Sequence, residues 1–566
     1  MVIMSSIFIL LVLTHHIFGE DTGHCSAMTD SCTETNYWGT FDWKSYIEKD
    51  LTVENIEDPL SKYGVDVVKS YETAYNRSIP DFRIHGCNKF STVKDSYKPV
   101  SIVITFFLEP RSVLLRTIVS IIERTPKELL KEIILVDDGN EDSSIGEELS
   151  VIKKVKLIRN QKREGLIRSR IIGAKATSDN VVMIFLDSHC EVGYDWVLPL
   201  LETIFVYPKS IVSPVIDNIN LYTFGFEPVS TYLRGEYSHI LRNGNFKRIY
   251  LIFKGGFDWS FDFFWEFIAH KDELQRKLQP YNSFPTPAIA GGLFAIEKDW
   301  FFELGAYDEG MEIWGVENIE LSVRAWTCGG ALRIAPCSRV GHIYKLSQPY
   351  DYPIGKTKTL ECNKIRFAKV WLDQFEVLFR STIQKSHISN DIECGDISPR
   401  IKLRKDLECK SFQWYLENIY PNMPIPNFGD IGFGSIFSRS DPYWLNCVDT
   451  ISPGDEGVLG VHTCIRSYSP QNFHYNKDRQ INRNDFCWTI QKGTDNIKPI
   501  YCDSQNQFQK WTPIYPNKSS KVRAGYSFFN NETDKCIEVN SEKKLIGAAC
   551  DLENLNQRFM FEMNSP

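Results

Sequence analysis

The feature that most constrains the fold is an apolar run from Val181 to Leu186 that ends in Asp187-Ser188-His189. A continuous apolar run without alternation predicts a strand buried on both faces, as in an α/β sheet. Residues i and i+2 of an extended chain point the same way, so Asp187 and His189 can reach one ion together. A carboxylate beside an imidazole suits a divalent cation such as manganese, and ligands bind at the carboxyl edge of such sheets. The alternative is a helix-capping aspartate and an ordinary polar histidine.

Strand and helix patterns alternate around this run. The predicted elements are strands at 101–108, 132–139 and 155–159, and helices at 112–126 and 167–177. This order predicts a doubly wound sheet of the nucleotide-binding type. Asp137 and Asp138 end one of these strands, where a carboxylate can accept hydrogen bonds from a uracil or a ribose. A turn with a helix cap is the alternative for this pair.

Three arginines lie in the segment KREGLIRSR (162–170): Arg163, Arg168 and Arg170. Their spacing suits an anionic phosphate or an ion pair with Asp138, and a solvated basic face is the alternative.

Further along, Trp314 and Glu317 fall in a glycine-containing turn, which could present an indole and a carboxylate to a sugar. His342 lies where a third metal ligand is needed, and the alternative is a buried histidine satisfied by backbone. Residues 217–283 are aromatic without a clear period, and their length predicts a lid or groove over a site.

The N-terminus places the chain in the secretory pathway. Residues 1–19 contain no Lys, Arg, Asp or Glu and centre on IFILLVL, which fits a signal peptide or a short signal anchor. Residues 20–97 are polar and are expected to pack loosely or along a neighbour, with Cys25 and Cys32 able to pair. Fifteen cysteines and the sequons at Asn76, Asn517 and Asn531 fit an oxidising lumen. The net charge of -8 argues against a nucleic-acid partner.

The last part of the chain is a threefold repeat of a cysteine pair followed by Gln-x-aromatic, with a period of roughly 40 residues. The three units are Cys447 to Cys464 with Gln471-Asn-Phe473, Cys487 to Cys502 with Gln509-Lys-Trp511, and Cys536 to Cys550 with Gln557-Arg-Phe559. Such units stack to bury one core, and the repeat favours pairing of the cysteines within each unit.

Taken together, these motifs identify a resemblance. KEIILVDD, KREGLIRSR, FLDSHCEV, AGGLFAIEKDWF, IWGVEN and CSRVGHIYK occur in the order and spacing of the polypeptide N-acetylgalactosaminyltransferases, the Golgi enzymes that begin mucin-type O-glycosylation. The resemblance covers the chain from about Val100 to its end. It implies an α/β catalytic domain of the GT-A, nucleotide-sugar-binding type followed by an all-β ricin-type β-trefoil. The expected boundaries are a stem at 20–97, the catalytic domain at 98–375, a linker at 376–444 and the trefoil at 445–566.

The resemblance also implies the activity. Enzymes of this family transfer N-acetylgalactosamine (GalNAc) from UDP-GalNAc to Ser or Thr of a protein, with manganese and with retention of anomeric configuration. Carried over by position, the metal ligands are Asp187, His189 and His342, and the nucleotide and sugar are held by Thr105, Asp138, Arg163 and Ser188. The gate over the donor contains Trp314, Lys345 and Tyr350, and Glu317 faces the sugar and the incoming hydroxyl. The implied disulfides are Cys87–Cys337 and Cys328–Cys409. The implied location is the Golgi lumen, with membrane attachment only through residues 1–19.

Several positions depart from the family pattern. Phe106-Phe107-Leu108-Glu109 stands where F-H-N-E is usual, Val316 replaces a glycine, Lys345 an arginine and Gln348 a histidine. These changes are compatible with an active enzyme of altered preference or with a weak or inactive member that acts as a binding protein. A carbohydrate-binding protein that acts through its trefoil is a third reading.

The trefoil repeats are altered as well. Asp449 keeps the carboxylate expected to bind a GalNAc hydroxyl, but Ile465, Arg466 and Pro470 replace the usual neighbours. The second repeat has Thr489 without a carboxylate, and the third has Glu538 in place of Asp. We therefore expect a mainly structural trefoil that binds GalNAc weakly.

Overall fold

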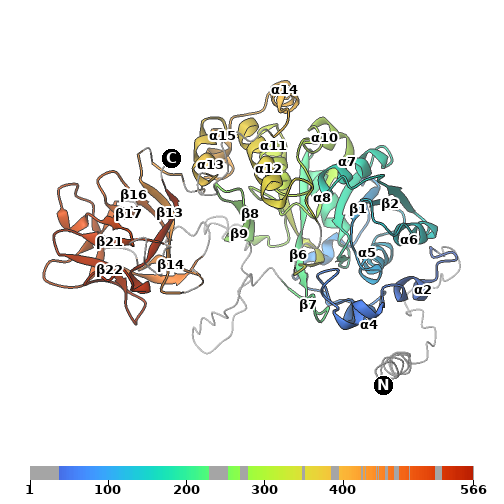
Figure 1. Ribbon diagram of the computed structural model, residues 1–566. Helices are drawn as coiled ribbons and strands as arrows, with labels where there is room; N and C mark the ends of the chain where they lie inside the picture. Colours follow the sequence, from blue (N-terminus) through green and yellow to red (C-terminus); the bar gives the residue numbers. More distant parts are fainter. Residues whose placement is uncertain are drawn as a thin grey trace, which may run out of the picture.

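The computed structural model consists of an α/β domain followed by an all-β domain (Figure 1). It describes residues 37–228, 253–267, 278–346, 351–383 and 394–564, with short gaps in the last range at 422, 424, 428, 442, 444, 453–456, 465–470, 484 and 517–524. The N-terminal segment 1–19, Cys25, Cys32, Gln348, Tyr350, Ile465, Arg466, Pro470 and Asn517 lie outside these ranges.

The first domain is built on a ten-stranded mixed sheet. The order along its main path is β10 (Phe284–Pro285), β12 (Ala331–Ile343), β6 (Ser210–Ile219), β11 (Phe294–Glu297), β4 (Val182–Asp187), β1 (Val100–Phe106), β2 (Leu130–Asp137) and β3 (Val155–Arg159). Strands β4, β1, β2 and β3 run parallel, and β11 runs antiparallel to β4. Two short strands complete the sheet: β5 (Cys190–Val192) pairs with β12, and β7 (Phe226–Glu227) with β6.

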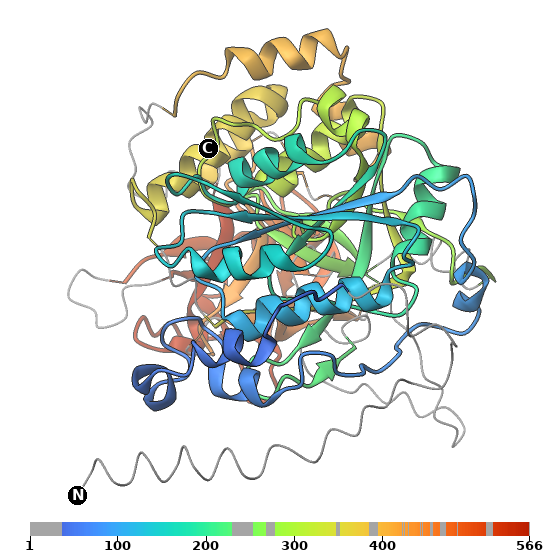
Figure 2. The ribbon, with the colours of Figure 1, turned by 90° about the vertical axis from the view of Figure 1, so that its right-hand side faces the viewer.

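Helices cover both faces of this sheet (Figure 2). Alternate residues of β1 point to opposite sides, so Ile102 and Ile104 join one core and Val103 the other. The first core contains α5 (Arg111–Arg124) and α8 (Val197–Val206), and the second contains α7 (Leu166–Ala176), α10 (Lys298–Glu303), α11 (Glu317–Thr327) and α12 (Lys356–Trp371). The central apolar run is therefore a strand buried on both faces, as predicted from its sequence.

The segment before the sheet is ordered and packed. It forms α2 (Trp43–Glu48), α3 (Val53–Glu57) and α4 (Val67–Glu72), each capped by a side chain that accepts a backbone N–H: Asp42, Thr52 and Asp66. Tyr46 is fully buried, and its hydroxyl donates to the carbonyl of Ile145 at 2.9 Å. The stem was expected either to pack loosely or to fold along a neighbour. Its described part folds along the α/β domain.

Disulfides tie the outer segments to the α/β domain. Cys87–Cys337 links the N-terminal segment to β12, and Cys328–Cys409 links α11 to the linker, which are the pairs implied by the resemblance. A third bond, Cys362–Cys394, was not foreseen. The linker forms α13 (Glu376–Ile383), α14 (Ser398–Asp406) and α15 (Phe412–Asn418), and Phe412, Tyr415 and Leu416 of α15 enter the second core.

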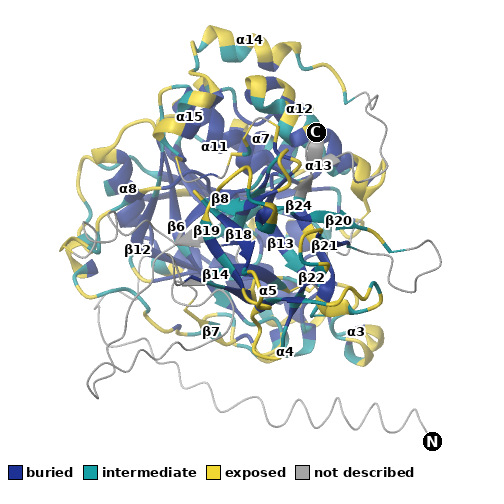
Figure 3. Cartoon of the chain, turned by 90° about the vertical axis from the view of Figure 1, so that its left-hand side faces the viewer, coloured by how far each residue is buried: buried dark blue, intermediate teal, exposed yellow. Residues whose placement is uncertain are grey.

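The second domain is all-β and has a core of its own (Figures 1 and 3). Its described residues form short strands. They are β13 (Gly432–Ser438), β14 (Asn446–Ser452), β15 (Val458–Thr463), β16 (Asn472–Tyr475), β17 (Ile481–Arg483), β18 (Phe486–Ile490), β19 (Ile497–Tyr501), β20 (Thr512–Ile514), β21 (Ser527–Asn530), β22 (Lys535–Val539), β23 (Leu545–Ala548) and β24 (Phe559–Asn564). Each repeat contributes its Gln-x-aromatic residue to the core, and each closes its own disulfide: Cys447–Cys464, Cys487–Cys502 and Cys536–Cys550. Within the described residues, no helix is both long and apolar enough to span a membrane.

Candidate functional site

A cavity of ≈ 400 Å³ opens at the carboxyl ends of β1, β2 and β4. Most of the residues singled out from the sequence line it: Thr105, Asp138, Arg163, Asp187, Ser188, His189, Trp314, Glu317, His342 and Lys345. Glycine is required at its floor, because a Cβ on Gly292 would lie 2.4 Å from Asp187 Oδ2 and one on Gly291 would lie 2.4 Å from Asn318 Cβ. The carboxyl edge of the sheet is thus the candidate site.

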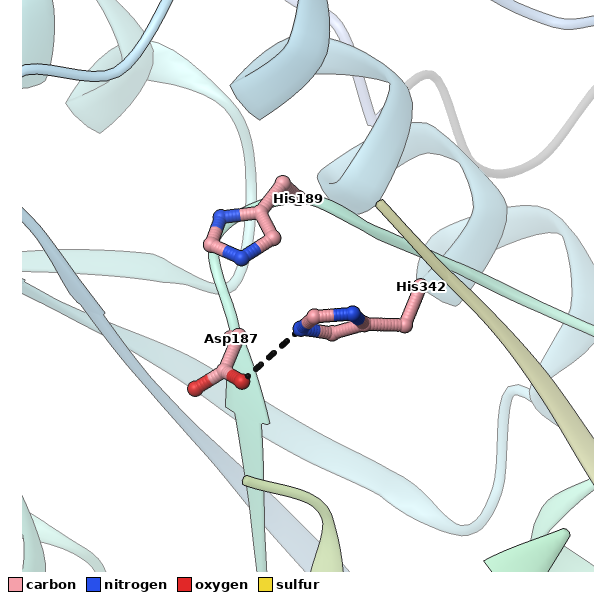
Figure 4. A group of neighbouring side chains, drawn as sticks. All are labelled: Asp187, His189 and His342. Carbon is pink, nitrogen blue, oxygen red and sulfur yellow. Dashed lines mark hydrogen bonds and ion pairs between the residues drawn. The ribbon is translucent and has the colours of Figure 1, made fainter. Parts of the chain in front are cut away.

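Three ligand-type side chains converge in this cavity (Figure 4). Asp187 ends β4, His189 follows two residues later, and His342 lies on β12 opposite Cys190 of β5. One ligand atom from each residue lies within 4.8 Å of the others, and His342 Nε2 is 3.2 Å from Asp187 Oδ2. One carboxylate and two imidazoles are a donor set that fits manganese. Strand geometry predicted from the sequence that Asp187 and His189 lie together. The third side chain, His342, reaches them from β12.

A buried arginine fixes the carboxylate. Arg170 Nη2 donates to Asp187 Oδ1 at 2.8 Å and to the Gly292 carbonyl at 2.8 Å, while Nη1 donates to the Gly291 carbonyl at 2.6 Å. Oδ1 is therefore held by Arg170, and Oδ2 faces His342. The prediction that Arg170 binds phosphate or pairs with Asp138 is wrong, since its partner is the candidate metal ligand.

A second buried group, Glu109, fixes the first histidine. Its Oε2 atom accepts from Ser188 Oγ at 2.6 Å and lies 2.9 Å from His189 Nδ1 and 3.1 Å from Lys345 Nζ. An imidazole that donates through Nδ1 presents the lone pair of Nε2 to a metal. Glu109 thus selects the tautomer of His189 that can bind a cation.

Burial and neighbouring polar groups determine the protonation states of Glu109, Asp187 and His342. Burial alone would raise the pKa of Glu109, but the charge of Lys345 and the hydrogen bonds from His189 and Ser188 outweigh burial and hold it at about 2. Burial would likewise raise the pKa of Asp187, but the hydrogen bond from His342 and the charge of Arg170 lower it well below its usual range. Burial lowers the pKa of His342, which favours a neutral imidazole. At neutral pH the site therefore presents an ionised carboxylate and a neutral His342, as cation binding requires.

Asp138 and Thr105 line the part of the cavity near β1 and β2. Asp138 accepts four protein hydrogen bonds, from the backbone N–H groups of Glu164 and Gly165, from Asn160 Nδ2 and from Ser169 Oγ. It therefore holds the loop before α7 in place as well as facing the cavity. Thr105 Oγ1 is buried and has no protein partner within the described structure, so a polar group of a ligand can bond to it.

Arg163 and Phe107 form one wall. The guanidinium of Arg163 lies 4.3 Å from the centroid of the Phe107 ring, and its Nη1 donates to the Asp351 carbonyl at 2.6 Å. Arg163 Nε lies 4.0 Å from Asp138 Oδ2, whereas Arg168 pairs with Glu164. Phe107, one of the departures from the family pattern, thus packs against a cavity arginine by cation–π contact.

Trp314, Val316 and Glu317 belong to the turn that enters α11. Asn363 of α12 fixes this turn: its Nδ2 donates to the carbonyls of Glu312 and Gly315. Glu317 Oε2 accepts from the Gly315 N–H at 2.6 Å, and burial raises its pKa. Val316 has φ 71° and is buried, so a β-branched residue occupies a left-handed conformation that suits glycine.

Tyr350 and Gln348 of the gate lie outside the described residues, whereas Lys345 reaches the cavity through its contact with Glu109. The described part of 217–283, including the hairpin of β8 (Phe253–Phe257) and β9 (Phe263–Phe267), contributes no residue to the cavity lining. Residues 229–252 and 268–277 lie outside the described ranges, so the lid or groove stays a prediction. Asn76 and Asn531 are exposed and therefore accessible as glycosylation sites.

Sequence reasoning did not identify Glu109 and Arg170 as supporting groups. Glu109 follows a buried strand just as Asp187 does, and the same strand-end rule could have found it. Arg170 was noted as a basic residue, but its partner could not be foreseen, because the glycine loop and Asp187 meet it only in three dimensions.

The trefoil repeats one polar arrangement three times. The glutamine of each Gln-x-aromatic motif donates to the residue two positions after the first cysteine: Gln471 to Asp449 at 2.9 Å, Gln509 to Thr489 at 3.0 Å and Gln557 to Glu538 at 2.7 Å. Asn554 also donates to Glu538 at 3.0 Å. The carboxylate of Asp449 is buried and already bonded within the protein.

Comparisons with known proteins agree with this geometry. Residues 101–300 match Glycosyl transferase family 2, residues 275–348 the N-terminal domain of galactosyltransferase, and residues 434–559 the ricin-type beta-trefoil lectin domain. The chain is 34% identical to Polypeptide N-acetylgalactosaminyltransferase 4 of Caenorhabditis elegans over 93% of its length and 84% of that protein. It is 42% identical to Polypeptide N-acetylgalactosaminyltransferase 14 of Homo sapiens over 84% of its length and 82% of that protein. A crystal structure of GalNAc-T7 with UDP, GalNAc and Mn2+ superposes with a TM-score of 0.60 at 31% identity, covering 91% of this chain and 92% of that one.

Proposed function

Because the chain belongs to the polypeptide N-acetylgalactosaminyltransferase family, we propose that it transfers GalNAc from UDP-GalNAc to Ser and Thr hydroxyls of proteins, the step that initiates mucin-type O-glycosylation. One observation carries the proposal: Asp187, His189 and His342 converge in a cavity at the carboxyl edge of a nucleotide-binding type of sheet.

Manganese is the cofactor that we propose for this site, held by Asp187, His189 and His342. The donor set supports this assignment, as does the Mn2+ named with the related GalNAc-T7 structure. The bound cation supplies charge neutralisation for the diphosphate leaving group. Arg170 and Glu109 orient the ligands before donor arrives, so little reorganisation is needed when it binds.

The remaining cavity residues have separate tasks. Lys345 adds a second positive charge beside the cation ligands, which favours binding of the diphosphate. Thr105, Asp138 and Arg163 also line the cavity, and we propose that they bind the uridine. Trp314 and Ile313 are apolar walls that limit the access of water, which would otherwise hydrolyse the donor.

We further propose that transfer retains the anomeric configuration, as the family resemblance implies. The acceptor hydroxyl then attacks from the face that the diphosphate leaves, and a diphosphate oxygen takes the hydroxyl proton. No separate protein base is needed for that route. Glu317, whose pKa is raised by burial, would orient the sugar and the incoming hydroxyl.

The departures from the family pattern are accommodated in the site. Phe107 stacks under Arg163, and Lys345 keeps a positive charge paired with Glu109. All three metal ligands are in place, and no described feature of the site favours an inactive binding protein over an enzyme.

The location proposed for this activity is the Golgi lumen. The six disulfides of the described residues support an oxidising compartment. The uncharged apolar segment within residues 1–19 supports entry into the secretory pathway, either as a cleaved signal or as an anchor.

The test is a transfer assay on the secreted lumenal part, residues 20–566. The protein is incubated with MnCl2, UDP-GalNAc and a mixed Ser/Thr peptide library, and both free UDP and peptide mass are followed. The parent should add one GalNAc mass to Ser/Thr peptides, and His189→Ala should not. His462→Ala, at an exposed histidine of β15, is the matched control and should behave like the parent. A folded parent that forms neither UDP nor glycopeptide would contradict the proposed function.

A further inference from the structure

We propose that the N-terminal turn of residues 60–67 holds Lys345 in the donor cavity and thereby sets the affinity for the diphosphate of the donor. This inference rests on the proposed function for the identity of the ligand. Its first observation is a backbone hydrogen bond between distant parts of the chain: the N–H of Leu346 donates to the carbonyl of Gly64 at 3.1 Å. The N-terminal segment thus contacts Leu346, the residue next to Lys345, whose cationic side chain lines the cavity.

Side-chain packing provides the second observation. Tyr63, Val65 and Val67 are buried in a small hydrophobic cluster with Ile343, the last residue of β12. Val113 of α5 and Phe224, near the end of β6, complete the cluster together with Ile219. Ile343 directly follows the metal ligand His342, so this cluster supports the end of the strand that reaches the site.

Lys345 lies between the hydrophobic cluster that contains Ile343 and the Leu346–Gly64 hydrogen bond. Strand β12 ends at Ile343, and beyond it the chain is held on one side by the cluster and on the other by the Leu346–Gly64 hydrogen bond. Lys345 Nζ is 3.1 Å from Glu109 Oε2 and lines the cavity. A lysine is a point charge on a flexible stem, unlike the fork of an arginine, so the position of its backbone largely decides where its charge can act.

The turn itself is fixed. Gly64 has φ 69°, and its N–H donates to the Leu60 carbonyl at 2.9 Å. The Asp66 carboxylate caps α4 by accepting from Lys69 N at 2.8 Å, and the Asp66 N–H donates to the Leu221 carbonyl at 3.1 Å. The Gly64 carbonyl is therefore held from both sides and can act as a rigid support.

The experiment measures binding of UDP in the presence of MnCl2 by titration calorimetry, together with KM and kcat for UDP-GalNAc. Val65→Ala should weaken UDP binding about fivefold and raise KM, because Lys345 loses its placement. Val53→Ala lies in the same N-terminal segment but is 68% exposed, and it should leave both quantities unchanged. If Val65→Ala does not fold, Gly64→Ala strains the same turn without removing buried apolar atoms.

A double-mutant cycle separates positioning from general destabilisation. Lys345→Met removes the charge on which the turn is proposed to act, so Val65→Ala should have no further effect on UDP affinity in that background. An equal loss in both backgrounds, or no loss in either, would overturn the inference. UDP affinity is measured without peptide. If the protein forms no glycopeptide, that outcome counts against the proposed function, and the effect of Val65→Ala on UDP affinity can still be interpreted.

Discussion

Glu109 is the residue that links three parts of the candidate site: the serine and histidine after β4 and the lysine after β12. All three donors share its Oε2 atom, so the geometry of His189 depends on one carboxylate. Groups that orient metal ligands in this way typically contribute a factor of about 10–100 to metal affinity or activity.

We therefore expect Glu109→Gln to raise the manganese concentration needed for half-maximal transfer by about 10–100-fold, because a neutral amide cannot balance Lys345 and can turn its NH2 group towards His189. The measurement is transfer rate against MnCl2 concentration. Glu141→Gln, at an exposed residue of the loop after β2, is the control and should match the parent. A parental manganese requirement in Glu109→Gln would show that the carboxylate has no such role.

Val316 gives a second prediction at this scale. Alanine and glycine both remove its buried side chain, but only glycine relieves the left-handed φ of 71°, a conformation that costs an L-residue about 1–2 kcal/mol. Val316→Gly should therefore be more stable than Val316→Ala by about 1 kcal/mol.

The control for this comparison is Val323, a buried residue in the interior of α11. There the usual order should hold, with the glycine variant about 1 kcal/mol less stable than the alanine variant. Urea unfolding of the four variants makes the comparison. If the alanine variant is more stable than the glycine variant at both positions, residue 316 is not strained.

At the scale of elements, α11 is joined to the linker by a buried ion cluster. Glu320 pairs with Arg324 on the same helix at 2.7 Å and with Arg400 of α14 at 3.0 Å. Burial would raise the pKa of Glu320, but the charges of the two arginines outweigh burial and hold it at about 2. Because the folded pKa is lowered, this carboxylate stabilises the fold fully above its unfolded value near 4.5 and loses that contribution as the pH falls towards 2.

Glu320→Gln should consequently destabilise the protein by about 3 kcal/mol at pH 7, since two buried arginines lose their counter-charge. The difference from the parent should shrink between pH 4.5 and pH 2, where the parental carboxylate becomes protonated. Urea unfolding at a series of pH values measures this. Asp406→Asn, in the exposed pair with Lys402, should change stability by less than about 0.5 kcal/mol. A pH-independent difference for Glu320→Gln would refute the electrostatic explanation.

The elements differ in how far the sequence predicts them. The strands β1, β2, β3 and β4 were predicted to within about two residues. For β1, β2 and β4 the signal is a largely apolar run, which marks a strand covered on both faces. The N-terminal helices α2, α3 and α4 are too short to show a period, and only their caps at Asp42, Thr52 and Asp66 signal them. His342 could be placed in the site only through the family resemblance, since β12 reaches it across the sheet.

At the scale of the whole molecule, the trefoil has its own core and its own disulfides, while Phe433 at its start packs with the core of the α/β domain. Asp449 is not among the residues that line the cavity, and it accepts a hydrogen bond from Gln471. The threefold repeat could be predicted from sequence because each unit carries the same motif. Its attachment to the first domain could not, because contacts such as that of Phe433 leave no periodic signal.

For the trefoil we expect no contribution to the chemistry. Asp449→Ala should leave transfer to short unglycosylated peptides within about twofold of the parent, because no described residue of the trefoil lines the cavity. Calorimetric titration of the parent with GalNAc should show at most weak binding. Millimolar or tighter binding to the trefoil that is lost in Asp449→Ala would contradict a mainly structural role.

We propose that β4 and β12 together form the cation site around which donor binding is organised. The most direct test of this claim is electron paramagnetic resonance of Mn2+ titrated into the folded protein with and without UDP. We predict one bound Mn2+ per chain, tighter binding when UDP is present, and loss of the bound signal in both Asp187→Asn and His342→Ala. Parental Mn2+ binding by a folded His342→Ala variant would contradict the claim, because it would place the cation away from the junction of the two strands.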